Sequence, residues 1–210
     1  YDTFYKSLIE AIPLKNVTSR FAMERIKSTT AFRVPPAPPR DHGFVLESSI
    51  GALGHLGPLK NVSPTSPWFH LHFGFEPLSF LMVFAEGDLV FSNTSYANRP
   101  PEPRGYALFG FGGGLRLTVK PMDRFGIYVQ GSAGGAKITE DVLFYYGHRN
   151  ADQLGLYWGG QLGFEWYQVN PHMALALHGG VKNYQDVLGR DRGGEQALAW
   201  TSGIALRYVF

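Results

Sequence analysis

The chain has no cysteine among its 210 residues. Disulfide bonds, thiolate nucleophiles and cysteine-ligated zinc sites are therefore excluded. No uninterrupted apolar stretch reaches the length of about 18 residues that a membrane-spanning helix needs. The formal net charge is only +2, so the chain has no strong overall field, and we expect no nucleic-acid partner.

Glycine and aromatic residues are, in contrast, abundant. The chain contains 26 glycines, 16 phenylalanines, 11 tyrosines and 4 tryptophans. These two groups seldom rise together in an ordinary soluble core. Their abundance indicates a fold that needs both very small and very bulky side chains.

Residues 1–40 differ from the rest of the chain. Their apolar side chains predict one face of a short amphipathic helix, formed by Phe4, Leu8, Ile9 and Ile12. Four prolines between positions 35 and 39 predict a stiff, extended linker after it. We therefore expect a partly helical N-terminal extension over 1–40 whose apolar face binds a partner, and a separate domain over 41–210.

From position 43 onward, apolar and polar residues alternate with a period of two. The alternation predicts eight strands, at about 44–52, 69–75, 81–91, 109–119, 125–133, 154–166, 173–181 and 198–210. Several of these segments keep the alternation for ten residues or more. That length suits a tilted membrane-crossing strand better than a globular strand of about five or six residues.

The predicted connections alternate between short and long. Short ones fall near 76–79, 121–124 and 169–171, and long ones near 55–66, 92–104, 138–153 and 184–195. An antiparallel up-and-down barrel with long loops at one rim and tight turns at the other has this pattern. We therefore predict an all-β, eight-stranded transmembrane barrel in which both chain ends lie on the tight-turn rim.

The size of the two faces decides which one points inward. An eight-stranded barrel has an interior just wide enough for side chains to fill, and the apolar face carries too many Phe and Trp residues to fit there. The apolar face should therefore contact lipid, and the glycine-rich polar face should line the interior, or lumen. The predicted polar network of the lumen comprises Glu47, His70, His72, Glu86, Asp88, Arg116, Gln130, Gln161, Glu165, His178, Lys182 and Arg207.

The domain resembles small bacterial outer-membrane β-barrels of the outer-membrane protein A and X type. The resemblance covers about residues 43–210 and includes the terminal "IALRYVF". In that family, a final Phe preceded by alternating hydrophobic residues is read by the barrel assembly machinery. The resemblance places this signal on Ile204, Leu206, Tyr208 and Phe210. It also implies an outer-membrane location with a periplasmic N-terminal extension, and contact with outer-membrane lipid and lipopolysaccharide.

Two histidines in "HLHFGFE" lie on the polar face of one predicted strand. If that strand pairs with the next around "EPLS", His70 lies roughly opposite Glu86, and His72 is the nearest same-face neighbour of His70. Two imidazoles and a carboxylate are transition-metal ligands. Same-face neighbours on one strand are about 6.5 to 7 Å apart, however, which strains joint ligation. The residues therefore favour a hydrogen-bonded plug, and we expect no bound metal or cofactor.

Three alternatives to a non-catalytic anchor or scaffold remain open. A lipid A or phospholipid modifying enzyme is one, because the helix before the barrel resembles that of the palmitoyl-transferring barrel enzyme. The sequence, however, has no Ser-His-acid grouping confined to the lipid-facing side. A small pore and a soluble ligand-binding barrel are the others. We expect a scaffold that holds a secretion, motility or surface-assembly complex through a periplasmic or outer-membrane protein partner.

Overall fold

The computed structural model describes residues 43–97, 104–168, 172–190, 193 and 196–210. The predicted N-terminal helix and linker lie outside these residues. The predicted barrel domain lies largely within them, and each of its eight predicted strands is present.

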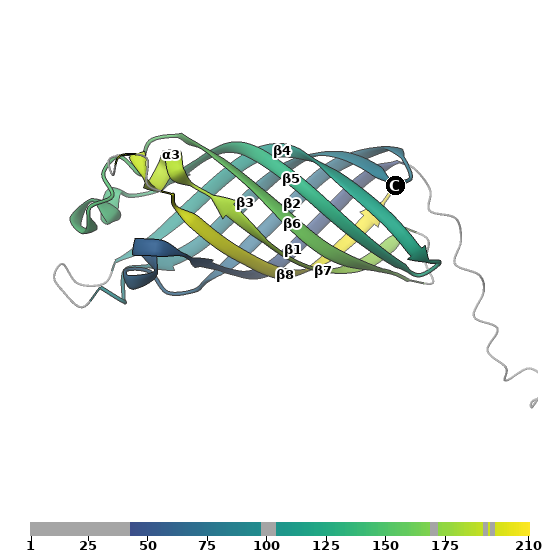
Figure 1. The fold of residues 1–210 in the computed structure, drawn as a ribbon, viewed down its shortest axis with the longest axis horizontal. Helices are drawn as coiled ribbons and strands as arrows, with labels where there is room; N and C mark the ends of the chain where they lie inside the picture. Colours follow the sequence, from purple (N-terminus) through teal and green to yellow (C-terminus); the bar gives the residue numbers. More distant parts are fainter. Residues whose placement is uncertain (1–42, 98–103, 169–171, 191–192, 194–195) are drawn as a thin grey trace, which may run out of the picture. The chain divides into compact units, whose positions relative to one another are not determined.

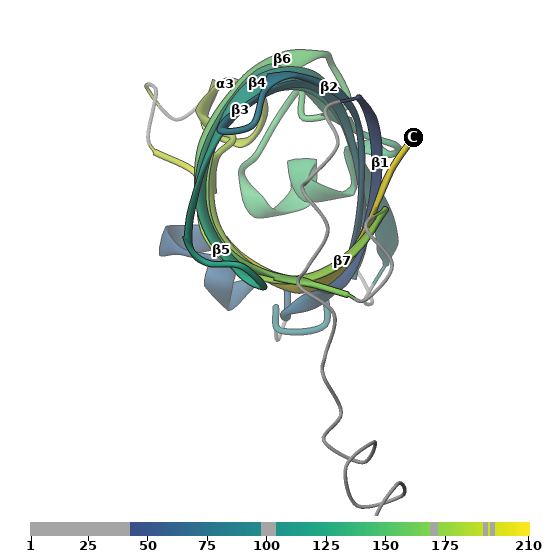
Figure 2. The same ribbon diagram turned by 90° about the vertical axis from the view of Figure 1, so that its right-hand side faces the viewer.

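Eight strands form one closed antiparallel barrel in sequence order (Figures 1 and 2). The strands are β1 (Phe44–His55), β2 (Ser66–Leu78), β3 (Leu81–Asn93), β4 (Gly105–Met122), β5 (Phe125–Ile138), β6 (Gly155–Tyr167), β7 (Met173–Asn183) and β8 (Leu198–Val209). The first and last strands pair from Val45 with Val209 to His55 with Ala199. This pairing closes the ring, so no strand edge is left without a partner.

The long and short connections lie at opposite ends of the barrel, as the sequence predicts. The end with the long connections, which we call the loop end, carries the short helices η1 (Gly57–Asn61), η2 (Asp141–Tyr146) and α3 (Gln185–Leu188) (Figure 1). The opposite end, the turn end, carries the tight turns, the first residues of β1 and the last residues of β8. None of the helical segments in the described ranges has the length and hydropathy of a membrane-spanning helix.

The turn between β2 and β3 lies later than predicted, and this changes the pairing. β2 continues through "EPL" to Leu78, and a register irregularity after Phe75 accommodates the extra residues. As a result, His70 lies opposite Asp88, and it is His72 that lies opposite Glu86. The predicted pairing of His70 with Glu86 was therefore wrong by one same-face step, because the proline in "EPL" does not end the strand.

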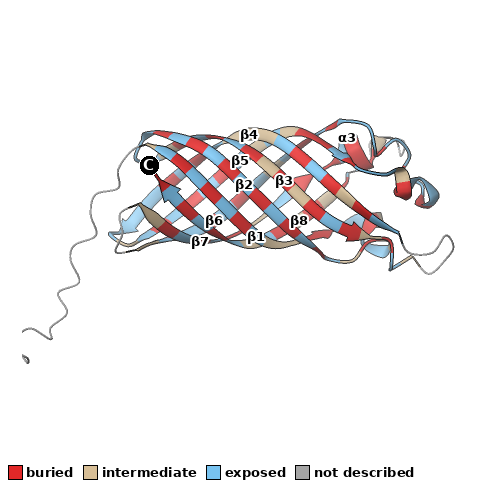
Figure 3. Ribbon diagram, turned by 180° about the vertical axis from the view of Figure 1, so that it is seen from behind, coloured by how far each residue is buried: buried red, intermediate tan, exposed pale blue. Residues whose placement is uncertain are grey.

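Side chains alternate between the outside and the inside along every strand (Figure 3). The outward face is apolar, and Ile204, Leu206 and Phe210 are 47 to 64% exposed. Each barrel strand also places polar or charged side chains on the buried face. The sequence prediction that the bulky face points outward is thus matched by the burial pattern.

An apolar cluster fills the loop end of the lumen. Leu59 of η1, Leu143 of η2 and Val187 of α3 pack in one cluster with strand residues such as Leu53 and Trp68. Each of these side chains is buried. The segments that form η1, η2 and α3 therefore pack onto the loop end of the barrel, which the strand periodicity did not predict.

Candidate functional site in the barrel lumen

All twelve residues predicted for the lumen network are buried inside the barrel. They come from each of the eight strands, because the period of two turns alternate side chains of every strand inward. Hydrogen bonds and ion pairs join eleven of them into three groups that follow one another from the turn end to the loop end.

Arg116 of β4 holds the central group together. Its guanidinium donates to both carboxylate oxygens of Glu47 at 2.6 Å each, and to Gln130 Oε1 at 2.7 Å. Gln130 in turn donates to Gln161 Oε1 at 2.9 Å. The ring of Tyr128 lies 4.1 Å from the guanidinium carbon. Arg116 is fully buried, so these contacts replace the water that its charge has lost.

Arg207 of β8 forms the group nearest the turn end. It donates to Glu165 Oε1 at 2.6 Å and to Glu76. Glu165 also accepts a hydrogen bond from Arg116 at 3.1 Å and one from Tyr167. Glu165 therefore links the turn-end group to the central group.

Lys182 of β7 forms the group nearest the loop end. Its ammonium donates to Asp88 Oδ2 at 2.5 Å and to Glu86 Oε1 at 3.2 Å. Trp68 Nε1 donates to the other oxygen of Asp88 at 2.7 Å, and the Tyr157 hydroxyl donates to Glu86 Oε1 at 2.5 Å. This group lies directly beneath the apolar cluster, which contains both Trp68 and Tyr157.

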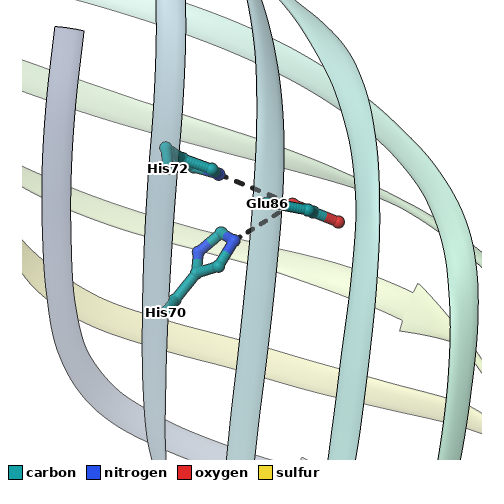
Figure 4. A group of neighbouring side chains, drawn as sticks. All are labelled: His70, His72 and Glu86. Atoms are coloured by element: carbon teal, nitrogen blue, oxygen red, sulfur yellow. Dashed lines mark hydrogen bonds and ion pairs between the residues drawn. The ribbon is translucent and has the colours of Figure 1, made fainter.

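The two strand-β2 histidines connect the loop-end group to the central group (Figure 4). His70 Nε2 lies 3.0 Å from Glu86 Oε2, and His72 Nε2 lies 3.5 Å from the same oxygen. His72 Nδ1 lies 2.9 Å from Glu47 Oε1. The two imidazole rings are 4.0 Å apart between centroids, well inside the strand repeat that argued against joint ligation.

His178 is the one predicted network residue that does not join the hydrogen-bonded groups. It is buried, but neither ring nitrogen has a hydrogen-bond partner among the described residues. Its ring packs edge-on against Trp68 at 5.5 Å between centroids. His178 therefore contributes packing rather than a polar contact.

The predicted network omits four residues that hydrogen-bond within it: Trp68, Glu76, Tyr157 and Tyr167. Glu76 and Tyr157 lie on the polar face that the alternation predicts, and parity is therefore the signal that finds them. Trp68 has the same parity as His70, but it precedes the predicted strand at 69–75. Tyr167 lies at the end of β6, where parity alone gives no contact.

Glycines on the lumen face make room for the aromatic members of the network. A Cβ at Gly163 would lie 2.3 Å from Tyr128 Cζ, and one at Gly112 would lie 2.6 Å from the Tyr157 hydroxyl oxygen. The abundance of glycine thus has a packing cause, because a narrow barrel cannot hold a bulky residue at every inward position.

The charges inside the barrel do not balance when the histidines are neutral. Five carboxylates are buried among the described residues, at Glu47, Glu76, Glu86, Asp88 and Glu165. Three buried cations face them, at Arg116, Lys182 and Arg207. The described lumen residues therefore carry a formal excess of two negative charges.

An apolar exterior around an ionic interior is the reverse of a water-soluble protein. A soluble monomer rarely exposes a large continuous apolar surface, whereas a barrel closed in lipid requires one. The chain is an eight-stranded transmembrane β-barrel. It has the fold of the small bacterial outer-membrane barrels that its sequence resembles.

Among known proteins, the chain is similar to solved outer-membrane proteins at low sequence identity. No family model and no curated protein matches the chain. A solved structure of OprG from Pseudomonas aeruginosa matches with a TM-score of 0.48 at 9% identity, covering 81% of this chain and 98% of that one. The outer-membrane enzyme PagL matches with a TM-score of 0.44 at 9% identity, covering 79% and 99%.

Ail of Yersinia pestis, solved in complex with the heparin analogue sucrose octasulfate, also matches the transmembrane barrel. The TM-score is 0.39 at 10% identity, covering 80% of this chain and 97% of that one. One of these proteins is an enzyme, and another was solved with a heparin analogue. The assignment of this barrel therefore depends on its own exterior and lumen, and its role needs a separate argument.

Proposed function

We propose that this barrel is a non-catalytic anchor or scaffold in the outer membrane that holds an envelope protein complex. The N-terminal extension would bind the partner through Phe4, Leu8, Ile9 and Ile12. One observation carries this proposal: the lumen is filled. A barrel with a filled lumen offers neither a water path nor a ligand cavity, which leaves its surfaces and its extension for function.

The packing of the lumen supports an anchor over a pore. Arg116, Lys182 and Arg207 are buried to 0% exposure, and their ion pairs join strands that are not neighbours in the barrel. The apolar cluster closes the loop end above them. An ion crossing the barrel would have to break this network and displace the cluster.

The chemistry of the lumen supports an anchor over a lipid-modifying enzyme. Ser49 of β1 pairs with His70 of β2, and His70 contacts Glu86, so the three residue types of a hydrolase triad are adjacent. Ser49 Oγ and His70 Nδ1 nevertheless make no hydrogen bond among the described residues. All three side chains are also buried, away from the lipid surface where such a substrate would lie. An activated serine needs a hydrogen bond to its histidine and access to its substrate.

The position of Gly43, which follows the extension, supports a periplasmic partner. Gly43 lies at the turn end, where its carbonyl accepts a hydrogen bond from the Glu76 amide at 3.0 Å. In barrels of this type the tight turns face the periplasm and the long loops face outward. The extension would therefore enter the periplasm, where a partner of a secretion, motility or surface-assembly complex can reach it.

The loop end has the chemistry to contact lipopolysaccharide. Tyr145 of η2 is exposed, and the Arg104 guanidinium carbon lies 5.9 Å from its ring. Arg149 lies 5.2 Å from the ring of the neighbouring Phe144. Arginine and aromatic side chains at this level suit the phosphates and sugars of the outer leaflet, which would fix the barrel in its membrane.

A pull-down from envelope membranes solubilised in mild detergent tests the partner proposal. The comparison uses the untruncated chain and a Leu8→Glu/Ile12→Glu variant, which places charges on the predicted binding face. Lys6→Glu is the matched control, because it changes charge on the opposite face of the same predicted helix. We expect the double variant to lose a stoichiometric companion that the unmodified chain and the control retain.

Unchanged companions in the double variant would contradict a role for the extension. The enzyme alternative is tested separately by thin-layer analysis of lipid A and phospholipid from cells with and without the protein. Lipid species that change with the protein would contradict a non-catalytic role.

A further inference from the structure

The two oxygens of Glu86 are used in different ways. Oε1 accepts hydrogen bonds from Tyr157 at 2.5 Å and from Lys182 at 3.2 Å. Oε2 faces the two imidazoles, with His70 Nε2 at 3.0 Å and His72 Nε2 at 3.5 Å (Figure 4). Donors on one side thus orient the carboxylate so that its other oxygen points at two ring nitrogens.

The proton of a neutral His72 can be placed from its neighbours. A carboxylate only accepts hydrogen bonds, so the 2.9 Å contact from His72 Nδ1 to Glu47 Oε1 requires a proton on Nδ1. Arg116 Nη2 also approaches Nδ1, but at the longer distance of 3.4 Å. In a neutral imidazole, Nε2 then carries a lone pair directed at Glu86 Oε2. Two lone pairs 3.5 Å apart in a buried site repel each other unless a cation lies between them.

Two of the three separations between the donor atoms are close to those of a tetrahedral metal site. Zinc binds imidazole nitrogen and carboxylate oxygen at about 2.0 to 2.2 Å, which separates neighbouring ligand atoms by roughly 3.3 to 3.6 Å. The two nitrogen-to-oxygen distances here are 3.0 and 3.5 Å. All three potential ligand atoms lie within 4.8 Å of one another. The geometry thus needs only small side-chain movements to close around an ion.

The surroundings of the three residues also suit a divalent cation. Ligating histidines in metal sites usually donate their other ring nitrogen to a carboxylate, which fixes the ring, and Glu47 does this for His72. Asp88 Oδ1 lies 3.8 Å from His70 Nε2 and adds negative charge on the same side. The formal excess of two negative charges in the lumen equals the charge of one divalent ion.

We propose that His70 Nε2, His72 Nε2 and Glu86 Oε2 bind one divalent transition-metal ion of the zinc class inside the barrel. Binding shifts the proton of neutral His70 from Nε2 to Nδ1, which has no other hydrogen-bond partner among the described residues, and leaves a fourth position for water or an oxygen of Asp88. The ion links β2 to β3 in the middle of the lumen. It is a structural staple that enters as the barrel closes, and it is independent of the partner proposed above.

Refolding of the full chain with zinc tests the proposal directly. The chain, without an affinity tag, is refolded in detergent with Zn²⁺ and then passed over a desalting column. Metal content is measured by plasma mass spectrometry, and folding by the shift in gel mobility on heating. We expect about one zinc per chain. His72→Gln should lower zinc affinity at least about tenfold. His178→Gln is the matched control, because His178 is a buried lumen histidine outside the cluster, and it should retain the zinc.

Three results would overturn the proposal. The first is a folded, unmodified barrel without zinc after refolding at micromolar Zn²⁺. The second is equal zinc retention in His72→Gln and His178→Gln, which would assign the ion to another site. If His72→Gln does not fold, the unmodified chain refolded with Co²⁺ decides alone. Tetrahedral nitrogen and oxygen ligation predicts visible absorption stronger than that of aqueous cobalt, and a spectrum like that of the free ion would exclude the site.

Discussion

Arg116 and Glu47 form a bidentate ion pair across the lumen, with both nitrogen-to-oxygen distances at 2.6 Å. They belong to β4 and β1, which are not neighbours in the barrel. The pair therefore bridges the lumen, whereas the backbone ladders connect only adjacent strands. Because both side chains are buried, the pair has large consequences for stability when one member is lost.

Glu47→Gln should destabilise the barrel by about 3 to 5 kcal/mol, because it leaves the Arg116 charge buried without its carboxylate. The free energy of unfolding is measured by urea titration of the chain in lipid vesicles. Asp186→Asn is the control, because Asp186 pairs with Arg190 at the surface at 3.8 Å, and such pairs contribute at most about 1 kcal/mol. An equal effect of the two substitutions would contradict the bridging role of Glu47.

Gly163→Ala should destabilise the barrel by about 1 to 3 kcal/mol through overpacking. The new methyl group would lie 2.3 Å from Tyr128 Cζ, and the Tyr128 ring is held beneath Arg116. Gly87→Ala is the matched control, because a Cβ at this strand glycine meets no atom within 4 Å. The two variants are compared by urea titration, and a tolerated Gly163→Ala would show that the lumen is looser than its contacts indicate.

Leu115→Arg should cost about 2 to 4 kcal/mol, whereas Val119→Arg should cost about 0 to 1 kcal/mol. Both residues lie on the outward face of β4, but Val119 is nearer the turn end, where an arginine reaches the interface. The measurement is the free energy of unfolding in vesicles. Equal costs at the two positions would contradict the predicted membrane depth along β4.

Phe210→Ala should reduce assembly in cells much more than it reduces stability after refolding. The backbone amide of Phe210 donates to the Phe44 carbonyl at 2.8 Å, and its side chain is 64% exposed. The substitution therefore removes few internal contacts, but it removes the last residue of the predicted assembly signal. Phe91→Ala, at another exposed outward aromatic residue, is the control. The readout is the amount of heat-modifiable barrel in membranes, and equal losses would argue against a signal.

The sequence predicts the barrel because alternation with a period of two is a local property. Strand pairing also follows the order of the chain, so eight alternating segments with short connections lead to one topology. Register is less accessible, since it depends on where each turn closes. The β2–β3 turn shows this. Because it closes later than predicted, the cross-strand partner of His70 is Asp88 and not Glu86.

The site could be predicted as a set of inward residues but not as a set of contacts. Parity and the bulk of the two faces placed Glu47 and Arg116 on the lumen face, but their bidentate pair depends on barrel width and on the tilt of β1 and β4. The convergence of His70 and His72 depends on side-chain rotamers that strand spacing does not determine. The apolar cluster at the loop end joins η1, η2 and α3, which are separated by long stretches of sequence.

Single-channel recording in planar lipid bilayers tests the central claim, a sealed transmembrane barrel, most directly. Flotation of the same vesicles on a density gradient first establishes that the barrel is inserted. The filled lumen predicts inserted protein without stable conductance steps. Reproducible steps from the unmodified chain, whose size or ion selectivity changes in Arg116→Ala, would place an open path through the lumen and contradict the account.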